Sequence, residues 1–163
     1  MDLYLLRHGP AVETDFKKYP NDDRPLSREG VQEMSEAAKG IVRIVPPFAL
    51  ILSSPLIRAK ATAEIVRNAY TEKIALTFSK DFLPEASTRD AISRLKEEAV
   101  PSLLVVGHNP SISELAARLL GLERAVIEFK KGALCRMVID GEPGRTPGLL
   151  KWFVTRKLLA QIR

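Results

Sequence analysis

Both histidines of the chain come directly after short apolar runs that predict buried strands. His8 follows residues 3–6 and precedes Gly9, and His108 follows residues 103–106. A neutral imidazole can attack phosphorus and carry the phosphoryl group, and a glycine beside it leaves backbone room for that group. A second imidazole can donate a hydrogen bond to an oxygen on which charge builds up. The two histidines therefore predict a nucleophile and an oxygen-binding group for phosphoryl transfer.

Two arginines and one carboxylate follow predicted strands in the same way. Arg7 ends the first strand, Arg58 falls in the first turn of a predicted helix, and Glu85 lies in the loop after a third strand. Arginine carries a permanent charge on a planar fork that matches phosphate oxygens, and a helix N-terminus also favours anions. Nearby cations lower the pKa of His8, so its imidazole stays neutral and ready to attack. A carboxylic acid such as Glu85 can protonate a leaving atom.

Each of these residues also has an ordinary structural explanation. His8 could be an inert histidine at a strand end, and the two arginines could be surface partners in ion pairs. Glu85 could be a solvated loop carboxylate, so its acid role stays open. A metal site made from the two histidines is not expected, because the sequence has no third histidine and no His-x-x-x-His pair.

The order of the predicted elements explains how these residues could meet. Apolar and β-branched runs predict strands over residues 3–6, 48–52, 74–78, 103–106, 125–129, 133–139 and 149–154. Start signals predict helices that open at Ser27, at Ser54 as an N-cap, and at capping boxes over residues 87–90 and 111–114, with stops at Pro46 and Gly121. Alternating strands and helices followed by hairpins indicate one α/β domain, residues 1–163, with a mostly parallel sheet and antiparallel C-terminal strands.

The residues that could do chemistry share a position relative to these strands. In an open α/β sheet, ligands bind just beyond the carboxyl ends of the strands. Arg7, His8, Arg58, Glu85 and His108 all follow such ends in the sequence. We therefore expect them at one edge of the sheet, around a pocket for a phosphoryl group.

Composition argues against several other classes of function. The chain has 163 residues and a net charge of +5, with its basic residues dispersed and only 6% aromatic residues, so a nucleic-acid stacking surface is not expected. No apolar run nears the ~18 residues that span a membrane, and the N-terminus lacks signal-peptide regions, so we expect a cytoplasmic protein. The single cysteine, Cys135, allows no internal disulfide and is expected, like Trp152, to serve packing.

Three motifs in this order resemble those of the histidine phosphatase superfamily, which contains phosphoglycerate mutases and acid phosphatases. They are Arg7-His8-Gly9, Ser54-Pro55…Arg58-Ala59…Thr62-Ala63 and Gly107-His108-Asn109, with weaker likeness at Arg24-Pro25-Leu26-Ser27…Gly30 and Lys131-Gly132-Ala133-Leu134. The resemblance spans essentially the whole chain. It is nearest to the short bacterial phosphohistidine phosphatases of SixA type.

This resemblance implies a fold and a set of roles. The fold would be the phosphoglycerate mutase-like three-layer α/β/α sandwich. His8 would become phosphorylated, while Arg7, Arg58 and His108 would hold the phosphoryl group. Glu85 resembles the position from which mutases draw their acid, although the short branch departs from the fuller mutase pattern.

The expected activity is a two-step hydrolysis through phospho-His8 that needs no metal and no cofactor, because arginines supply the positive charge. Only residues 86–107 separate Glu85 from His108, too few to form an inserted segment that covers the site. An open site favours a phosphohistidine on another protein, such as a phosphorelay domain, as the substrate. A small phosphorylated molecule is the alternative substrate. A phosphoprotein-binding module without turnover is the alternative from another class. No nucleic acid or membrane partner is expected.

Overall fold

The computed structural model describes residues 1–20 and 22–163. Its strands are β1 (Asp2–Arg7), β2 (Leu50–Ser53), β3 (Ala75–Phe78), β4 (Ser102–Gly107), β5 (Leu134–Val138) and β6 (Leu149–Val154). Its helices are α1 (Arg28–Ile44), α2 (Ile57–Ala69), α3 (Thr88–Lys96), α4 (Ser111–Leu119) and α5 (Arg156–Leu159), with a short 3₁₀ turn, η1 (Lys80–Phe82). Every predicted strand except the one over residues 125–129 is confirmed to within two residues.

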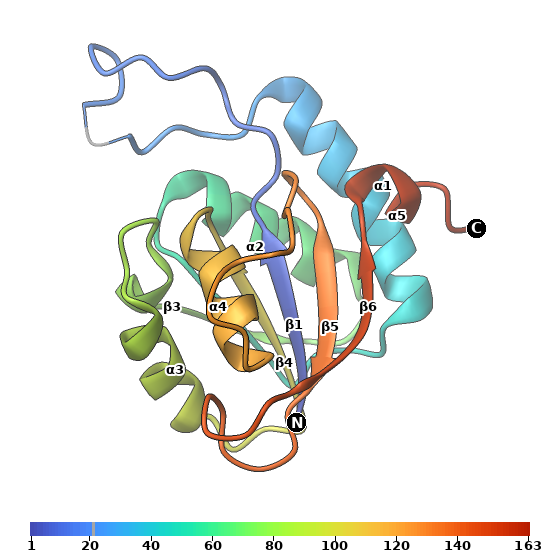
Figure 1. Ribbon diagram of the computed structural model, residues 1–163. Coiled ribbons are helices and arrows are strands. Elements are labelled where there is room, and N and C mark those ends of the chain that lie inside the picture. Colours follow the sequence, from blue (N-terminus) through green and yellow to red (C-terminus); the bar gives the residue numbers. More distant parts are fainter. Residues whose placement is uncertain (21) are drawn as a thin grey trace.

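All six strands of the described chain form one sheet in the order β3-β2-β4-β1-β5-β6 (Figure 1). The first four in this order run parallel, whereas β5 and β6 are antiparallel to their neighbours. Because β4 lies between β1 and β2, Arg7 pairs with Gly107 and Ser53 pairs with Val106. The carboxyl ends of three central strands therefore meet at one edge.

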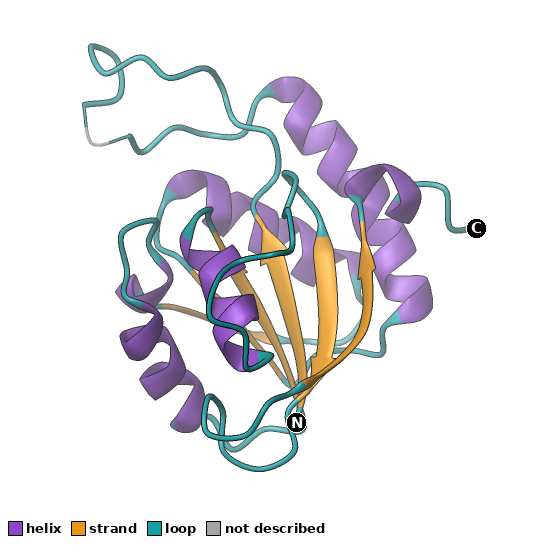
Figure 2. Ribbon diagram, viewed as in Figure 1, coloured by secondary structure: helices purple, strands orange, loops and turns teal. Residues whose placement is uncertain are grey.

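Helices cover both faces of the sheet (Figure 2). Side chains alternate along a strand, so β1 contributes to two cores. Tyr4 and Leu6 are buried with residues of α1, α2 and α5, whereas Leu3 and Leu5 are buried with residues of α3 and α4. This arrangement confirms the predicted three-layer α/β/α sandwich with a mostly parallel sheet.

The predicted strand over residues 125–129 is wrong, because this segment is a loop. Both edges of β1 are already taken by β4 and β5, and β5 lies between β1 and β6, so neither β1 nor β5 can pair with this segment. The carbonyl of Phe129 instead accepts hydrogen bonds from the side chains of Arg7 and Asn109. A run of apolar and β-branched residues can therefore form a loop that contacts site residues, instead of a strand of the sheet.

All four predicted helix starts are confirmed to within two residues, but only two of the four predicted caps are correct. The hydroxyls of Ser27 and Ser87 cap α1 and α3, as predicted. The N-caps of α2 and α4 are instead Leu56 and Pro110, and neither side chain makes a capping hydrogen bond. Ser54 is not the cap of α2, since its hydroxyl lies against Nε2 of His108. Its N–H donates to the carbonyl of Val106, which extends the strand ladder by one residue. The serine at 111 lies inside α4, and its hydroxyl donates to the carbonyl of His108.

The packing roles predicted for two side chains are confirmed. Cys135 is fully buried, and the Trp152 ring lies 6.0 Å from the Tyr4 ring, centroid to centroid. Within residues 1–20 and 22–163, no helix combines the length and the apolar character needed to cross a membrane.

Candidate active site

His8 lies just past the end of β1 with its ring held in one tautomer. Its backbone N–H donates to the carbonyl of Gly107, which fixes the residue against β4. The ring Nδ1 lies 2.7 Å from the carbonyl oxygen of Gly9. A carbonyl only accepts, so Nδ1 carries the hydrogen and Nε2 keeps a free lone pair. This is the atom that a nucleophilic imidazole must offer.

The surroundings of His8 keep this imidazole neutral. Burial, together with the charges of Arg58, Arg7 and Lys131 and against the opposing effect of the Gly9 carbonyl, lowers its pKa to about 3. At pH 7 the ring is therefore uncharged and its lone pair is available.

His108 packs directly against His8. The two ring centroids lie 4.9 Å apart, and His108 is only 1% exposed. Its Nε2 lies 2.8 Å from the hydroxyl oxygen of Ser54, whereas its Nδ1 is buried and has no hydrogen-bond partner among the described residues. Burial, followed by His8, Arg58 and Arg7, lowers the pKa of His108 to about 2, so this ring too is neutral at pH 7.

Arg7 and Arg58 are anchored at their outer nitrogens. Arg7 Nη1 donates to the carbonyl of Phe129 at 2.7 Å. Arg58 Nη1 donates to the carbonyl of Asp22 at 2.5 Å, and its Nη2 lies 3.2 Å from the carboxylate of the same residue. The Nε atoms of both arginines are buried and lack a partner in the described part of the chain. Two guanidinium donors and one ring nitrogen of His108 thus remain for the oxygens of a phosphoryl group.

Gly9 ties the nucleophile to the arginine-bearing helix. Its N–H donates to the hydroxyl of Thr62, which in turn donates to the carbonyl of Arg58. A Cβ at Gly9 would collide with the side chain of Met34, so only glycine fits at this position. A glycine after His8 therefore allows close packing against Met34, and it also leaves room for the phosphoryl group to reach His8.

The site holds a cation that the sequence reasoning missed. The N–H of Gly132 donates to the carbonyls of Arg7 and His8, which brings the preceding Lys131 to the site. Burial, followed by the charges of Arg7, Arg24, Arg58 and Arg156, lowers the pKa of Lys131. In the sequence this lysine looked like dispersed surface charge. The glycine after Lys131 was the available signal in the sequence, because glycine is the residue that adopts a positive φ in turns. In the structure Gly132 has a φ of +76°.

The structure does not bring Glu85 into this buried cluster. The residue lies in the loop between η1 and α3, and its side chain is exposed. It forms no hydrogen bond or ion pair with the described residues. Arg7, His8, Arg58 and His108 are brought together at the predicted edge of the sheet, whereas Glu85 faces solvent.

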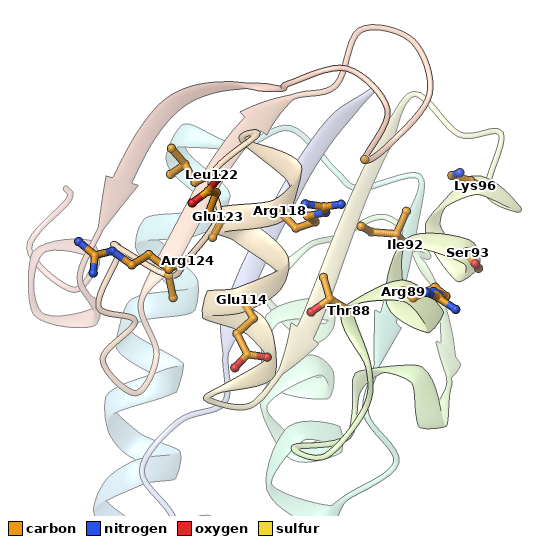
Figure 3. Close-up of a pocket in the computed structure, with 13 residues that line it drawn as sticks. Thr88, Arg89, Ile92, Ser93, Lys96, Glu114, Arg118, Leu122, Glu123 and Arg124 are labelled. Atoms are coloured by element: carbon orange, nitrogen blue, oxygen red, sulfur yellow. The ribbon is translucent and has the colours of Figure 1, made fainter.

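The donor set of the site suits an anion. In residues 1–20 and 22–163, no three His, Cys, Asp or Glu side chains gather in a way that could hold a metal ion. A surface cleft of about 660 Å³ lies elsewhere, between α3 and α4 (Figure 3). Basic and acidic side chains such as Arg118 and Glu114 line it together, and it includes neither histidine. The candidate site is therefore the buried cluster at the carboxyl edge.

Acidification should destabilise the protein through both histidines. Their pKa values in the folded state, about 3 and about 2, lie below the ordinary 6.5. Below pH 6.5 the unfolded chain therefore binds protons that the folded chain does not, and the free energy of unfolding falls. From pH 7 to pH 5 we expect each histidine to remove roughly 2 kcal/mol. Urea unfolding at both pH values checks this, and the loss should shrink by about half in His8→Gln; an unchanged loss would contradict it.

Comparison with known proteins places this geometry among phosphatases. Residues 3–81 match the model of the histidine phosphatase superfamily (branch 1). An uncharacterized protein of Picosynechococcus sp. is 34% identical over 146 residues, which cover 82% of this chain and 87% of that protein. Phosphohistidine phosphatase SixA of Escherichia coli is 27% identical over 159 residues, covering 93% and 92%. The structure of the protein histidine phosphatase SixA complexed with tungstate superposes with a TM-score of 0.83 at 25% identity, covering 98% of this chain and 99% of that one.

Proposed function

Because the chain belongs to the histidine phosphatase superfamily, in its SixA-type branch, we propose that this hydrolase removes the phosphoryl group from a phosphohistidine on another protein. One observation carries the proposal. The Nδ1–H of His8 is committed to Gly9, so a neutral Nε2 lies free beside two arginines whose buried Nε atoms have no partner among residues 1–20 and 22–163. This arrangement pairs a nucleophile with donors for the oxygens of the group that it attacks.

In the first proposed step, the Nε2 lone pair of His8 attacks the substrate phosphorus. A new P–N bond forms while the bond to the leaving nitrogen breaks, and the electron pair goes to that nitrogen. When the substrate imidazole arrives protonated, it leaves as a neutral ring. Arg7, Arg58 and His108 hold the three phosphoryl oxygens as charge spreads over them.

In the second proposed step, water attacks the phosphorus of phospho-His8. The P–Nε2 bond breaks, its electron pair returns to the ring, and inorganic phosphate leaves. Glu85 is the residue that we assign to accept the proton of this water, and to protonate an alkoxide when the substrate is a phosphomonoester. Its exposed position makes this assignment the one that most needs a test.

The proposed kind of substrate is supported by the names of two relatives and by the short segment between η1 and β4. Two relatives are named phosphohistidine phosphatase SixA or its homolog, and they match the chain over most of their length. Between η1 and β4 the chain holds only α3 and its loops, without an inserted roof over the site. We therefore propose a protein substrate, and within that class a phosphorelay domain.

A substrate panel tests the proposal. Phosphate release is measured as kcat/KM on a phosphorelay domain phosphorylated on histidine, on free phosphohistidine and on small phosphomonoesters. We expect the protein substrate to be turned over best. If a phosphomonoester exceeds it, the chain is a small-molecule phosphatase of the same family. If no substrate is hydrolysed and no phospho-His8 forms, the chain is a binding module and the proposal fails.

Chelation should leave the activity unchanged. The charge on the phosphoryl oxygens is compensated by Arg7, Arg58 and Lys131, and the described residues contain no cluster of metal ligands. We therefore expect equal rates of phosphate release with and without EDTA. The matched control is the chelated enzyme with added Mg²⁺. A loss in EDTA that a divalent ion restores would contradict the mechanism.

A further inference from the structure

The geometry points to Ser54 as the residue that sets the tautomer of His108, so that His108 presents an N–H to the phosphoryl group. This inference deepens the proposed function and rests on it for the identity of the bound group. Ser54 is a positioning residue in this scheme, because it acts through the imidazole of His108. It was predicted from the sequence as a helix cap, a role that the structure excludes.

The hydrogens available around Ser54 can be counted. Its hydroxyl oxygen lies 2.8 Å from Nε2 of His108 and accepts the N–H of Leu56 at 3.4 Å. A backbone N–H can only donate, so the Leu56 contact uses a lone pair and leaves the hydroxyl hydrogen free. When that hydrogen points at Nε2, the hydroxyl and Nε2 are both satisfied. The ring hydrogen then sits on Nδ1, which has no partner among the described residues and is left for a phosphoryl oxygen.

The opposite tautomer leaves two groups unsatisfied. With a hydrogen on Nε2, the ring would donate to Ser54, and the hydroxyl hydrogen would have no acceptor among the contacts of Ser54 in the described residues. Nδ1 would then present a lone pair beside an anionic phosphoryl group, and two lone pairs repel. Nδ1 is already buried without a partner, so a second unsatisfied group would add to its cost.

The position of Ser54 prevents its hydroxyl from turning elsewhere. The residue is 0% exposed, so water does not compete for the hydroxyl. Its backbone N–H donates to the carbonyl of Val106, two residues before His108. The strand end of β2 thus holds Ser54 at a fixed place beside the strand end of β4.

The two histidines then carry hydrogen on the same ring atom but use opposite sides of the ring. His8 donates from Nδ1 to Gly9 and offers the lone pair of Nε2 to phosphorus. His108 accepts at Nε2 from Ser54 and offers Nδ1–H to a phosphoryl oxygen. One backbone carbonyl and one hydroxyl are enough to give two neighbouring imidazoles different functions.

Nitrogen NMR on the isotope-labelled protein at about pH 7 tests the inference without any assay of activity. The chain has two histidines, so the spectrum contains two rings, which His8→Gln assigns. We expect both rings to carry hydrogen on Nδ1. A His108 ring protonated on Nε2 would overturn the inference, even in an active phosphatase. A His108 ring protonated on Nδ1 supports it, even if the phosphohistidine panel shows no turnover.

Variants at neighbouring serines add a functional readout. Ser54→Ala removes the hydroxyl that fixes the ring, whereas Ser53→Ala removes an equally buried hydroxyl that donates to a backbone carbonyl and not to His108. We expect Ser54→Ala to mix the tautomers of His108 and to weaken the binding of tungstate on the order of 10-fold, with Ser53→Ala close to wild type. The ring of His8, held by Gly9, should keep its tautomer in both variants.

Ser54→Thr keeps the hydroxyl and separates this role from packing. If Ser54→Ala fails to fold, the wild-type and Ser54→Thr spectra still decide, because both should show His108 with hydrogen on Nδ1. Equal loss of tungstate binding in Ser54→Ala and Ser53→Ala, with the His108 tautomer unchanged in both, would reduce Ser54 to a packing residue and overturn the inference.

Discussion

Replacing His8 with alanine should abolish turnover, with a loss on the order of 10⁴-fold or more in phosphate release. The reason is that no second group can take its place: His108 lies beside it but presents its Nε2 to Ser54. Covalent labelling by a phosphoryl donor should disappear as well. In the wild type this label should resist alkali and be lost in acid, as expected for phosphohistidine.

The control for this prediction is a variant that keeps the nucleophile. His108→Gln should still accept the label, at a reduced rate, because Nε2 of His8 remains free. His8→Asn retains more of the buried volume than alanine and guards against a folding defect, which urea unfolding would detect. Labelling of His8→Ala at the wild-type level would refute the assignment of the nucleophile.

Glu85→Gln should separate two classes of substrate. A phosphomonoester leaves as a poor alkoxide and needs a proton donor, an effect typically worth 10²–10⁴-fold. The imidazole of a phosphohistidine can leave already protonated and needs that donor far less. We therefore expect Glu85→Gln to slow the hydrolysis of alkyl phosphates sharply and the dephosphorylation of a phosphohistidine protein only mildly. The measurement is kcat/KM for both substrates.

Glu123→Gln is the matched control, since Glu123 is also exposed but lines the cleft between α3 and α4, away from the histidines. It should leave both rates unchanged. Large and equal losses on both substrates in Glu85→Gln would make Glu85 an obligatory acid and weaken the case for phosphohistidine. No loss on either would show that Glu85 is only a solvated loop carboxylate.

Local sequence was enough to place most of the elements and the main site residues. Strands and helices follow from the spacing of apolar residues within a few neighbours, and this spacing predicted β1, β2, β4 and the helices between them. Because parallel strands end at a common edge, the residues after them had to meet there. The gathering of Arg7, His8, Arg58 and His108 at this edge is therefore predictable from the sequence.

The details that make the site reactive depend on contacts between distant residues. Only the strand order places β4 between β1 and β2, and this order sets the ring of His108 between His8 and Ser54. Local propensity holds no information about which strands pair, so Ser54 resembled a helix cap. The same limit applies to residues 125–129. Their composition suits a strand, but β1 and β5 already have partners on both sides and the segment is a loop.

Charge and exposure also belong to the tertiary structure. The shift in the pKa of His8 comes mainly from burial, and burial is a property of the packed molecule, not of the motif Arg7-His8-Gly9. Lys131 joins the site because a backbone hydrogen bond from Gly132 reaches across to β1, while Glu85 stays in solvent. The sequence by itself determined which groups the site could contain; the folded chain decided which of them are neutral, buried and in contact, because desolvation and hydrogen bonding act only between groups that folding brings together.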